Sequence, residues 1–263
     1  MKENKDHFKD VTLLITHYNR SKSLERLLDH FDKIDVSFGE IVVSDDHSKD
    51  EHIQYIKKLQ EKYGFKFITT PQNGGLGNNI NKGQDAVTGD FILYVQEDFF
   101  PLPLFNQVFK NGLNIIKEDQ SIDSVRFYSY LDYPDKKPYK DNFSELVFKP
   151  FSSNLDRFPL YSDHPHVKRA SFPQKFGRYA EGKNPEKTEF DMMISFLQHK
   201  GRGLLYNDYK SVFDQVNTSS EPSTMNDNRN KKPWRNSENF FVRQARHLYR
   251  HAIFNYSLYF KKY

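Results

Sequence analysis

The 263-residue sequence contains no cysteine. A disulfide scaffold, a zinc site with thiolate ligands and a cysteine nucleophile are therefore excluded. Long apolar runs are also absent: the longest span about five residues, as at 91–95, whereas a membrane-spanning helix needs about 20. The opening MKENKDHFKD is polar and lacks the apolar core of a secretion signal. We therefore expect a cytoplasmic chain.

Aromatic residues are plentiful, with 24 Phe and 16 Tyr making up most of the 16% aromatic content. Disordered chains are poor in such residues, so the sequence predicts a folded protein. A chain of this length corresponds to one large domain or two small ones. We see no internal repeat and no low-complexity tract.

The net charge of +4 is unevenly distributed along the chain. Residues 229–263 carry nine Lys or Arg against one acid, Glu238, so this tail has a charge of +8 and residues 1–228 have −4. A basic tail can bind nucleic acid, but nothing in the rest of the chain resembles a nucleic-acid-binding module. We therefore expect no nucleic-acid partner.

Short β-rich apolar runs alternate with helical periodicities over about the first 115 residues. The predicted strands cover 11–15, 40–44, 65–68 and 91–95, and the predicted helices cover 21–31, with Ser21 as N-cap, 50–63, 78–87 and 104–117. This alternation predicts an α/β fold with a parallel sheet flanked by helices. Ligands of such sheets bind beyond the carboxyl ends of the strands.

The pattern weakens after residue 118. We predict a strand at 124–130, a helix at 186–199, a short strand at 204–206, a polar loop at 217–239 and a C-terminal helix at 240–260. Residues 131–185 are rich in Pro, Tyr, Phe, Lys and Asp and show few clean periods.

Five polar clusters fall where such a sheet binds ligands or at a later helix start. They are THYNR at 16–20, SDDHSKD at 44–50, the glycine-rich NGGLGNNINKG at 73–83, QED at 96–98 and TEFD at 188–191. Glycines permit close backbone approach to a phosphate, and carboxylates at a strand end suit Mg²⁺ or Mn²⁺. Taken singly, each cluster can also be an ordinary turn, a helix cap or a pair of solvated acids.

In this order and spacing, the clusters resemble the family 2 glycosyltransferases with the GT-A nucleotide-sugar-binding fold. The matches are T-x-Y-N-R at 16–20, D-D-x-S-x-D at 45–50, N-x-G-x-G…N-x-G at 73–83, G-[DE]-[YF]-I-x-x-[LV]-D-x-D at 89–98, and an acidic helix start at 188–189. The resemblance covers about residues 10–215. Two positions depart from the pattern: Gln96 replaces the first acid of D-x-D, and Ile80 stands where arginine is common.

The resemblance implies an inverting transfer of a sugar from a nucleotide diphosphate, a UDP-sugar in first place, to a glycan or lipid-linked acceptor. It implies a Rossmann-like GT-A domain over 1–228, with a donor half at 10–117, an acceptor half at 118–228 and a basic, aromatic helical tail at 229–263. The implied donor-binding residues are Thr16, Tyr18, Asn19, Arg20, Asp45, Asn73, Gly75 and Asn81, with Asp45 reading the base beside Thr16.

The same resemblance assigns the chemistry to three carboxylates. Asp98 is expected to hold a divalent ion, Mn²⁺ or Mg²⁺, that offsets the charge of the leaving diphosphate. Glu189 is expected to act as general base toward the acceptor hydroxyl, and Asp191 is the reserve candidate. His164 and His166 lie in the region expected to contact the acceptor.

Two other functions stay open. A sugar nucleotidyltransferase would carry a glycine-rich stretch after its first strand, and 16–20 contains no glycine. A non-catalytic nucleotide-sugar or glycan-binding protein is compatible with the loss of an acid at Gln96. Comparing donor hydrolysis with and without Mn²⁺ separates the latter from an enzyme.

The predicted C-terminal helix is amphipathic. A helical wheel places Arg243, Arg246 and Arg250 opposite an apolar face formed by Phe241, Ala245, Leu248, Tyr249, Ala252, Tyr256 and Tyr259. This pattern fits a helix packed on the domain, a helix lying on the inner face of a membrane, or a contact between copies of the chain.

Overall fold

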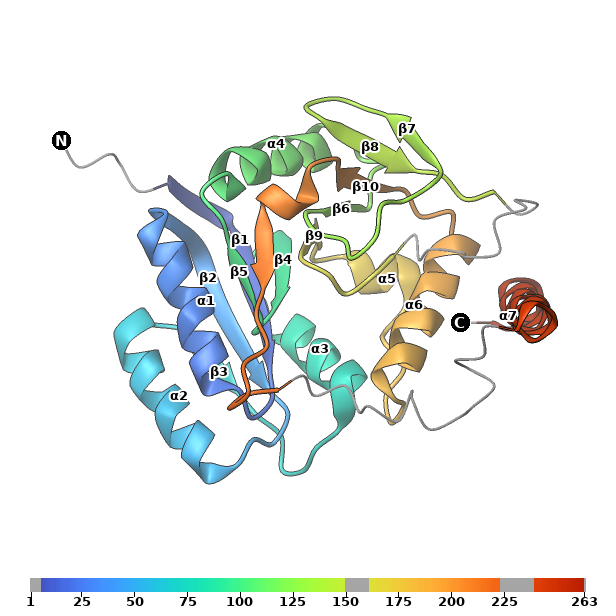
Figure 1. The fold of residues 1–263 in the computed structure, drawn as a ribbon. Helices are drawn as coiled ribbons and strands as arrows, with labels where there is room; N and C mark the ends of the chain where they lie inside the picture. The colour runs from blue at the N-terminus through green and yellow to red at the C-terminus, as the bar shows by residue number, and fades with distance from the viewer. Residues whose placement is uncertain (1–5, 150–160, 223–238, 263) are drawn as a thin grey trace.

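The computed structural model describes residues 6–149, 161–222 and 239–262 (Figure 1). The expected boundary between 228 and 229, and most of the loop predicted at 217–239, lie outside these residues. The helices are α1 (Ser21–Lys33), α2 (Asp50–Tyr63), α3 (Gly75–Ala86), α4 (Phe105–Glu118), α5 (Phe172–Phe176), α6 (Pro185–Gln198) and α7 (Phe240–Phe260), with a 3₁₀ turn η1 (Tyr209–Ser211). The strands are β1 (Asp6–His17), β2 (Val36–Asp45), β3 (Lys66–Ile68), β4 (Phe91–Gln96), β5 (Phe99–Pro101), β6 (Ser124–Arg126), β7 (Lys136–Pro138), β8 (Phe143–Leu146), β9 (His166–Arg169), β10 (Gly203–Tyr206) and β11 (Phe213–Gln215).

Nine of the described strands form one sheet in the order β3-β2-β1-β4-β9-β6-β10-β8-β7. The first four are parallel, as predicted, whereas β9 and β8 run against their neighbours, so seven of the nine strands share one direction. The sheet is therefore mixed but mostly parallel. The chain order reverses at β1, between β2 and β4, which is where sheets of this kind bind ligands.

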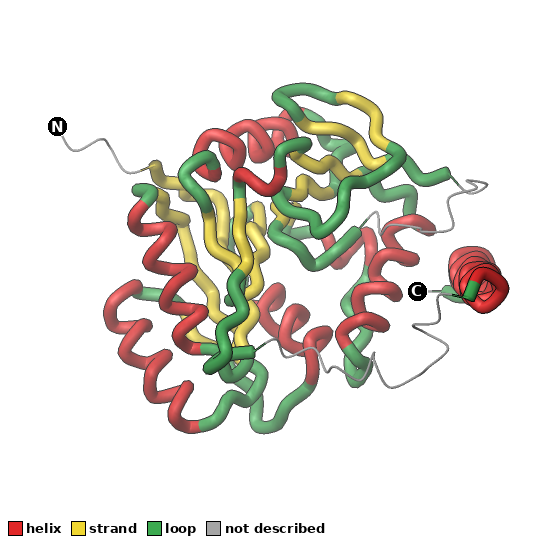
Figure 2. The backbone as a smooth tube through the Cα atoms, viewed as in Figure 1, coloured by secondary structure: helices red, strands yellow, loops and turns green. Residues whose placement is uncertain are grey.

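Helices cover both faces of the sheet, as Figure 2 shows. The alternation of side chains along β1 feeds two cores: Leu13 and Ile15 pack with α1, α2 and α4, whereas Leu14 packs with α3, α5 and α6. Aromatic rings fill much of the first core, where Phe105 stacks on Phe109 at 5.1 Å between ring centroids. The high aromatic content is thus used to build a packed interior.

Three sequence expectations need correction. Ser21 begins α1 but is not its N-cap, because that position is Arg20 and no side chain of the cap residue accepts a hydrogen bond. The strand expected at 124–130 ends at Arg126, and the helix expected from 78 begins at Gly75. Within 131–149 and 161–185, the structure has three strands, β7 to β9, each of three or four residues and too short to show a period.

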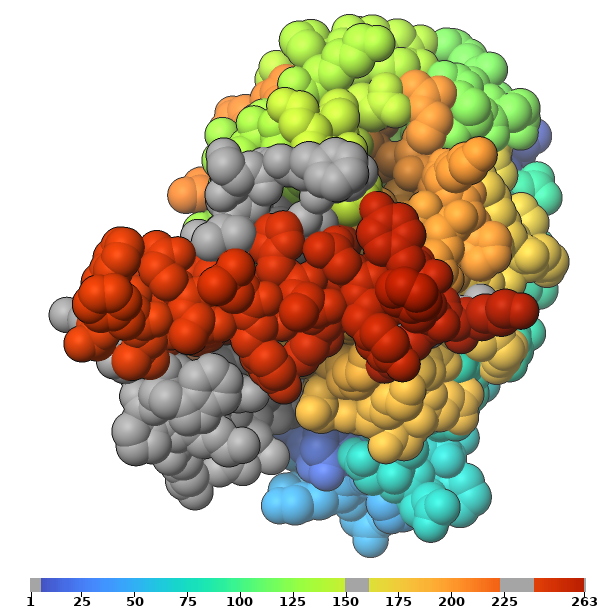
Figure 3. Space-filling model, turned by 90° about the vertical axis from the view of Figure 1, so that its right-hand side faces the viewer, coloured from blue at the N-terminus to red at the C-terminus, as the bar shows by residue number. Residues whose placement is uncertain are grey.

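Helix α7 lies as a ridge across one side of the molecule (Figure 3). It packs against α6 through Phe254 and Ser257, the only residues of this helix that are buried. The apolar face predicted from the sequence is not the packed one: Phe241, Leu248 and Tyr256 are between 58% and 79% exposed. Within the described part of the chain, no helix combines the length and apolarity needed to cross a membrane.

Candidate active site

A cleft of about 880 Å³ lies at the carboxyl ends of β1 and β4. The strand register brings the polar clusters level, since Thr16 pairs with Ser44 of β2 on one side and with Gln96 of β4 on the other. The volume suits a substrate-sized ligand. The residues that line the cleft include Thr16, Tyr18, Arg20, Asp46, Asn73, Gly75, Gln96, Glu97, Asp98, Arg126, Tyr130, Asp163, His164, Lys183, Glu186, Glu189, Gln215 and Asn217.

Five of the eight predicted donor-binding residues line this cleft: Thr16, Tyr18, Arg20, Asn73 and Gly75. The other three, Asn19, Asp45 and Asn81, do not line it. Asn19 ties two turns together, since its amide donates to Ser48 Oγ at 2.8 Å and its Oδ1 accepts from the amide of Lys49. Asn19 adopts a positive φ of 53°, which asparagine tolerates better than most residues.

Asp45 is fully buried at the end of β2. Its carboxylate accepts hydrogen bonds from the Ser48 amide at 3.0 Å and Thr69 Oγ1 at 2.8 Å, and it pairs with His17 Nδ1 at 2.8 Å. Burial alone would raise the pKa of Asp45, but the hydrogen bonds from His17 and Ser48 outweigh it and lower the pKa to about 2. Direct contact of Asp45 with a nucleotide stays a prediction.

Asp46 is the aspartate of this pair that lines the cleft. Its two carboxylate oxygens accept hydrogen bonds from the amides of Gly74 and Gly75 at 2.8 and 2.9 Å. Gly75 has a φ of 78°, a conformation that side-chain-bearing residues rarely adopt. Asp46 therefore fixes the glycine-rich loop against the end of β2.

Asn81 serves the packing of α3 instead of the cleft. Its side chain donates to the Tyr179 carbonyl and to Glu181, and accepts from the Tyr179 amide. Gly77 contributes to the same contact, because a Cβ there would lie 2.2 Å from the carbonyl oxygen of Ala180. This part of the glycine-rich motif thus joins the donor half to the segment that precedes α6.

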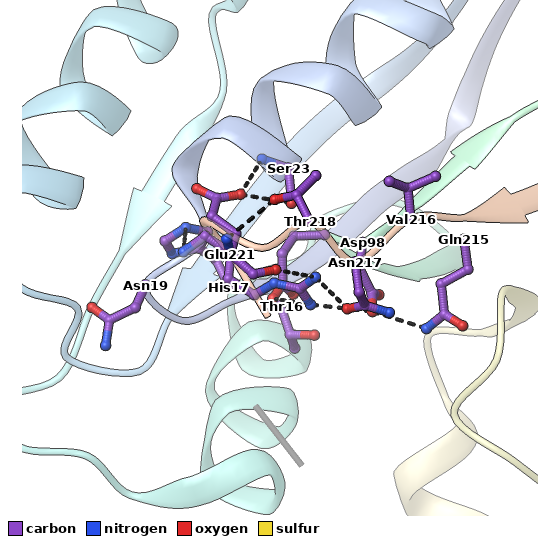
Figure 4. Close-up of polar contacts among 12 residues, drawn as sticks. Thr16, His17, Asn19, Ser23, Asp98, Gln215, Val216, Asn217, Thr218 and Glu221 are labelled. Atoms are coloured by element: carbon purple, nitrogen blue, oxygen red, sulfur yellow. Dashed lines mark hydrogen bonds and ion pairs between the residues drawn. The ribbon is translucent and has the colours of Figure 1, made fainter. Parts of the chain in front are cut away.

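Arg20 links the carboxyl end of β4 to the loop that follows β11. Figure 4 shows Asp98 and Asn217, the two residues that it joins. Arg20 Nη1 lies 3.1 Å from Asp98 Oδ2 and 3.4 Å from Glu97 Oε1, and Arg20 Nη2 donates to Asn217 Oδ1 at 2.6 Å. In the same loop, Glu221 accepts from the amides near the start of α1 and takes over the capping role expected of Ser21. Burial and the charge of Asp98 raise the pKa of Glu97 to about 8 against the opposing effect of Arg20.

Asp98 offers one carboxylate oxygen as a possible ligand of a divalent ion. Its Oδ2 is engaged by Arg20 and by Gln215 Nε2 at 2.8 Å, whereas its buried Oδ1 has no partner within the described part of the chain. No cluster of three or more potential metal ligands occurs in 6–149, 161–222 or 239–262. The residues therefore fit an ion held by one protein oxygen and otherwise by phosphate and water, a common arrangement for Mg²⁺.

Glu189 lies in the first turns of α6, which begins after Asn184; the Asn184 side chain caps the Lys187 amide at 2.9 Å. Glu189 is half-buried, lines the cleft and accepts from the Asp163 amide at 3.2 Å. Burial raises the pKa of Glu189, although the Asp163 amide and the positive charge of Arg126 oppose the increase.

Asp191 is buried outside the cleft lining, 2.9 Å from Lys183 Nζ and in an ion pair with Lys187. The helix thus separates the two candidate bases and leaves Glu189 at the cleft. His164 also lines the cleft. His166 does not: it is buried between Tyr161 Oη at 3.0 Å and the carbonyl of His164 at 2.7 Å.

Several residues that line the cleft were not among the site residues predicted from the sequence, including Asp46, Arg126, Asp163 and Gln215. Asp46 is itself the second acid of the D-D-x-S-x-D match at 45–50, and Arg126 ends strand β6, so position alone could have indicated both. Asp163 and Gln215 fall in segments without a motif and carried no such signal. Gln215 spans the cleft, since it donates to Asp98 and accepts from Tyr130 Oη at 2.8 Å.

Comparison with curated proteins gives partial matches. The poly-beta-1,6-N-acetyl-D-glucosamine synthase of Staphylococcus aureus (strain COL) is 27% identical over 95 residues, 36% of this chain and 23% of that protein. The GalNAc(5)-diNAcBac-PP-undecaprenol beta-1,3-glucosyltransferase of Campylobacter jejuni is 28% identical over 93 residues, 34% of this chain and 29% of that protein. The match thus spans only about a quarter of the length of these relatives.

Solved structures share the fold. TarS 1-349 of S. aureus in complex with UDP-GlcNAc has a TM-score of 0.60 at 18% identity, covering 96% of this chain and 76% of that one. The mannosyltransferase PcManGT from Pyrobaculum calidifontis, in complex with GDP-Man and Mn²⁺, has a TM-score of 0.56 at 14% identity, covering 92% and 62%. The family model described as Glycosyl transferase family 2 matches residues 12–171, more than half of the sequence. The chain therefore belongs to glycosyl transferase family 2.

Proposed function

We propose that the protein moves a sugar, with inversion, from a nucleotide diphosphate donor to a hydroxyl of a glycan or lipid-linked acceptor. One observation carries this proposal. A single cleft holds both Asp98, just after β4, and the half-buried Glu189 of α6, and Asp98 Oδ1 has no partner among the described residues. TarS of S. aureus forms a complex with UDP-GlcNAc. One curated relative is named as the synthase of a poly-N-acetylglucosamine, and the other as a glucosyltransferase of an undecaprenol-linked glycan. These likenesses support a UDP-sugar donor and an acceptor of that kind.

The donor is proposed to bind over the ends of β1, β2 and β4. Thr16, Tyr18 and Arg20 come from the turn after β1, and the glycine-rich loop adds Asn73 and Gly75. Thr16 Oγ1 is hydrogen-bonded to Tyr94 Oη at 3.0 Å, which fixes its position in the cleft. In this arrangement Asp45 acts by holding the turn that presents Asp46.

Transfer needs a base on the acceptor side of the anomeric carbon. The acceptor O–H gives its proton to the carboxylate of Glu189 while its oxygen forms a bond to the anomeric carbon, and the bond to the diphosphate breaks on the opposite face. A raised pKa makes Glu189 a stronger base than an exposed glutamate. A divalent ion, Mn²⁺ or Mg²⁺, held by Asp98 Oδ1 would offset the charge of the departing diphosphate.

We further propose the division into a donor half at 10–117, an acceptor half at 118–228 and a tail at 229–263, with α7 lying on the inner face of a membrane. Its exposed side chains include Phe241, Leu248 and Tyr256, and 240–260 contains no acidic residue. Exposed aromatic side chains together with arginines suit an interface with anionic lipids. Such contact would bring a lipid-linked acceptor to the cleft.

The proposal is tested with the purified full chain and a panel of UDP-, GDP- and dTDP-sugars. Thermal shift identifies the donor, since a ligand at about 100 times its Kd stabilises a protein by about 2.7 kcal/mol. Release of the nucleotide diphosphate is then followed with and without Mn²⁺, and NMR of the product reports the anomeric configuration. Stabilisation by none of the donors would refute the proposal, and retention of configuration would refute the inverting mechanism.

A further inference from the structure

A second carboxylate lies beside Glu189 in the cleft wall. Asp163 is 4% exposed and lines the cleft, yet neither of its carboxylate oxygens has a hydrogen-bond partner within 6–149, 161–222 and 239–262. Its backbone amide donates to Glu189 Oε1 at 3.2 Å, which keeps the two residues together. A buried carboxylate without hydrogen bonds is costly, so two unmet acceptor atoms in a cleft wall indicate a ligand that donates hydrogen bonds.

The charges around Asp163 indicate which kind of hydrogen-bonding group on the ligand fits there. Burial, together with the negative charge of Glu189, raises the pKa of Asp163 to about 8, and the positive charges of Lys168 and Arg126 oppose this increase. Lys168 is buried and donates to two tyrosine hydroxyls at 3.1 and 3.2 Å. Arg126 supplies positive charge to both carboxylates, and Lys168, whose pKa burial lowers to about 7, adds to it at Asp163, so the site does not need a positively charged ligand. Neutral hydroxyl groups fit it better.

An exposed aromatic ring stands in the same part of the cleft. Tyr130 is 57% exposed, and its ring meets the ring of His164 edge to face at 4.5 Å. Its hydroxyl donates to Gln215, which anchors the ring. His164 Nδ1 is a further buried polar atom without a partner in the described part of the chain. An aromatic ring beside unpaired acceptors suits a pyranose, which has an apolar C–H face and a rim of hydroxyls.

We propose that Asp163 binds the acceptor: its carboxylate receives hydrogen bonds from two neighbouring hydroxyls of a neutral sugar whose ring packs against Tyr130, and a further hydroxyl is thereby presented to Glu189. This inference rests on the proposed function. It defines the acceptor as a neutral sugar with vicinal hydroxyls, in preference to an amine or a phosphate. Asp163 is a specificity-determining residue, whereas Glu189 performs the proton transfer.

The test uses Asp163→Asn, with Asp132→Asn as the control because Asp132 is exposed outside the cleft. Transfer to methyl glycosides of glucose, galactose and N-acetylglucosamine is measured with the identified donor. Measured above pH 8, where a carboxyl with a pKa of about 8 is ionised, Asp163→Asn is expected to raise the acceptor KM about ten-fold or more, the usual effect of losing hydrogen bonds to a charged group. The affinity for UDP, donor hydrolysis and the control variant should stay at wild-type levels.

A second comparison has a first part that uses only the wild type, so this part does not depend on a well-folded variant. Glycosides that lack one of the two vicinal hydroxyls should bind the wild-type, UDP-saturated protein more weakly in saturation-transfer NMR, and Asp163→Asn should no longer discriminate against them. Any one of four results would overturn the inference: an unchanged acceptor KM in Asp163→Asn, equal binding of the deoxy glycosides by the wild type, no binding of any neutral glycoside, or tighter binding of the 2-amino glycoside. A wild type that neither binds UDP nor turns over any nucleotide sugar would refute the proposed function itself, and the inference with it.

Discussion

Replacing Glu189 by glutamine tests the proposed base with little change in shape. The side-chain oxygen of glutamine can still accept from the Asp163 amide, which now lies 3.2 Å from Glu189 Oε1, so the fold should be retained. The amide cannot take up a proton, and loss of a general base lowers kcat by about 10²–10⁴-fold. This corresponds to an increase of about 3–5 kcal/mol in the activation free energy.

Asp191→Asn is the matched comparison, because Asp191 lies in the same helix but outside the cleft lining. It loses ion pairs between a buried carboxylate and the partly exposed Lys183 and Lys187, so we expect a stability loss of about 1–3 kcal/mol. Its kcat should stay close to that of the wild type. The two variants therefore separate a chemical role from a structural one.

Single-turnover kinetics after titration with the donor measures both effects. Donor affinity should be unchanged in both variants, since neither residue is assigned to the donor side of the cleft. The pH profile adds an independent criterion: burial raises the pKa of Glu189, so wild-type kcat/KM should fall as pH decreases through that raised pKa. Glu189→Gln should lack this acid limb. Normal turnover by Glu189→Gln together with an inactive Asp191→Asn would refute the assignment.

Three further predictions concern stability and membrane contact. The pKa of Glu97 is about 8 in the folded protein, whereas the ordinary pKa of a glutamate is 4.5. Between these pH values the folded state binds more protons than the unfolded state, so the free energy of unfolding should decrease as pH rises from 4.5 to 8. Glu97→Gln should flatten that slope in urea titrations. Glu221→Ala removes the acceptor for the first amides of α1 and should cost about 0.5–2 kcal/mol; an unchanged melting curve would argue against this cap. Leu248 is 66% exposed, so Leu248→Glu should weaken binding to phosphatidylglycerol vesicles without lowering the melting temperature. The buried Phe254 is the comparison, and Phe254→Ala should lower the melting temperature. Equal vesicle binding by the wild type and Leu248→Glu would contradict the membrane role.

The donor half could be predicted from the sequence because its signals are strong and local. Apolar runs at 11–15, 40–44 and 91–95 are bounded by polar clusters, and parallel pairing brings the ends of such strands to one edge. What the sequence could not decide is which of two adjacent aspartates faces the cleft. The side chain of Asp45 does not line the cleft and is hydrogen-bonded to His17, a neighbour across the sheet that lies 28 residues away in the chain.

The acceptor half was harder to predict for a physical reason. Strands β7 to β9 have only three or four residues, and a period of two cannot be recognised over so short a run. Asp163 lies just before β9 and is placed by its amide contact with Glu189, which is 26 residues further along the chain. Contacts of this kind, between loops and a distant helix, leave no pattern in the sequence.

The choice between Glu189 and Asp191 shows where a local signal was available. Residues two apart on an α-helix point about 200° away from each other, so only one of the two can face the cleft. Lys187 stands four residues before Asp191, a spacing that pairs opposite charges on one helix face, and the structure contains this ion pair. The pair commits Asp191 to a structural contact and leaves Glu189 as the carboxylate of this helix turn that lines the cleft. Burial raises the pKa of Glu189, whereas the carboxylate of Asp191 pairs with two lysines, Lys183 and Lys187.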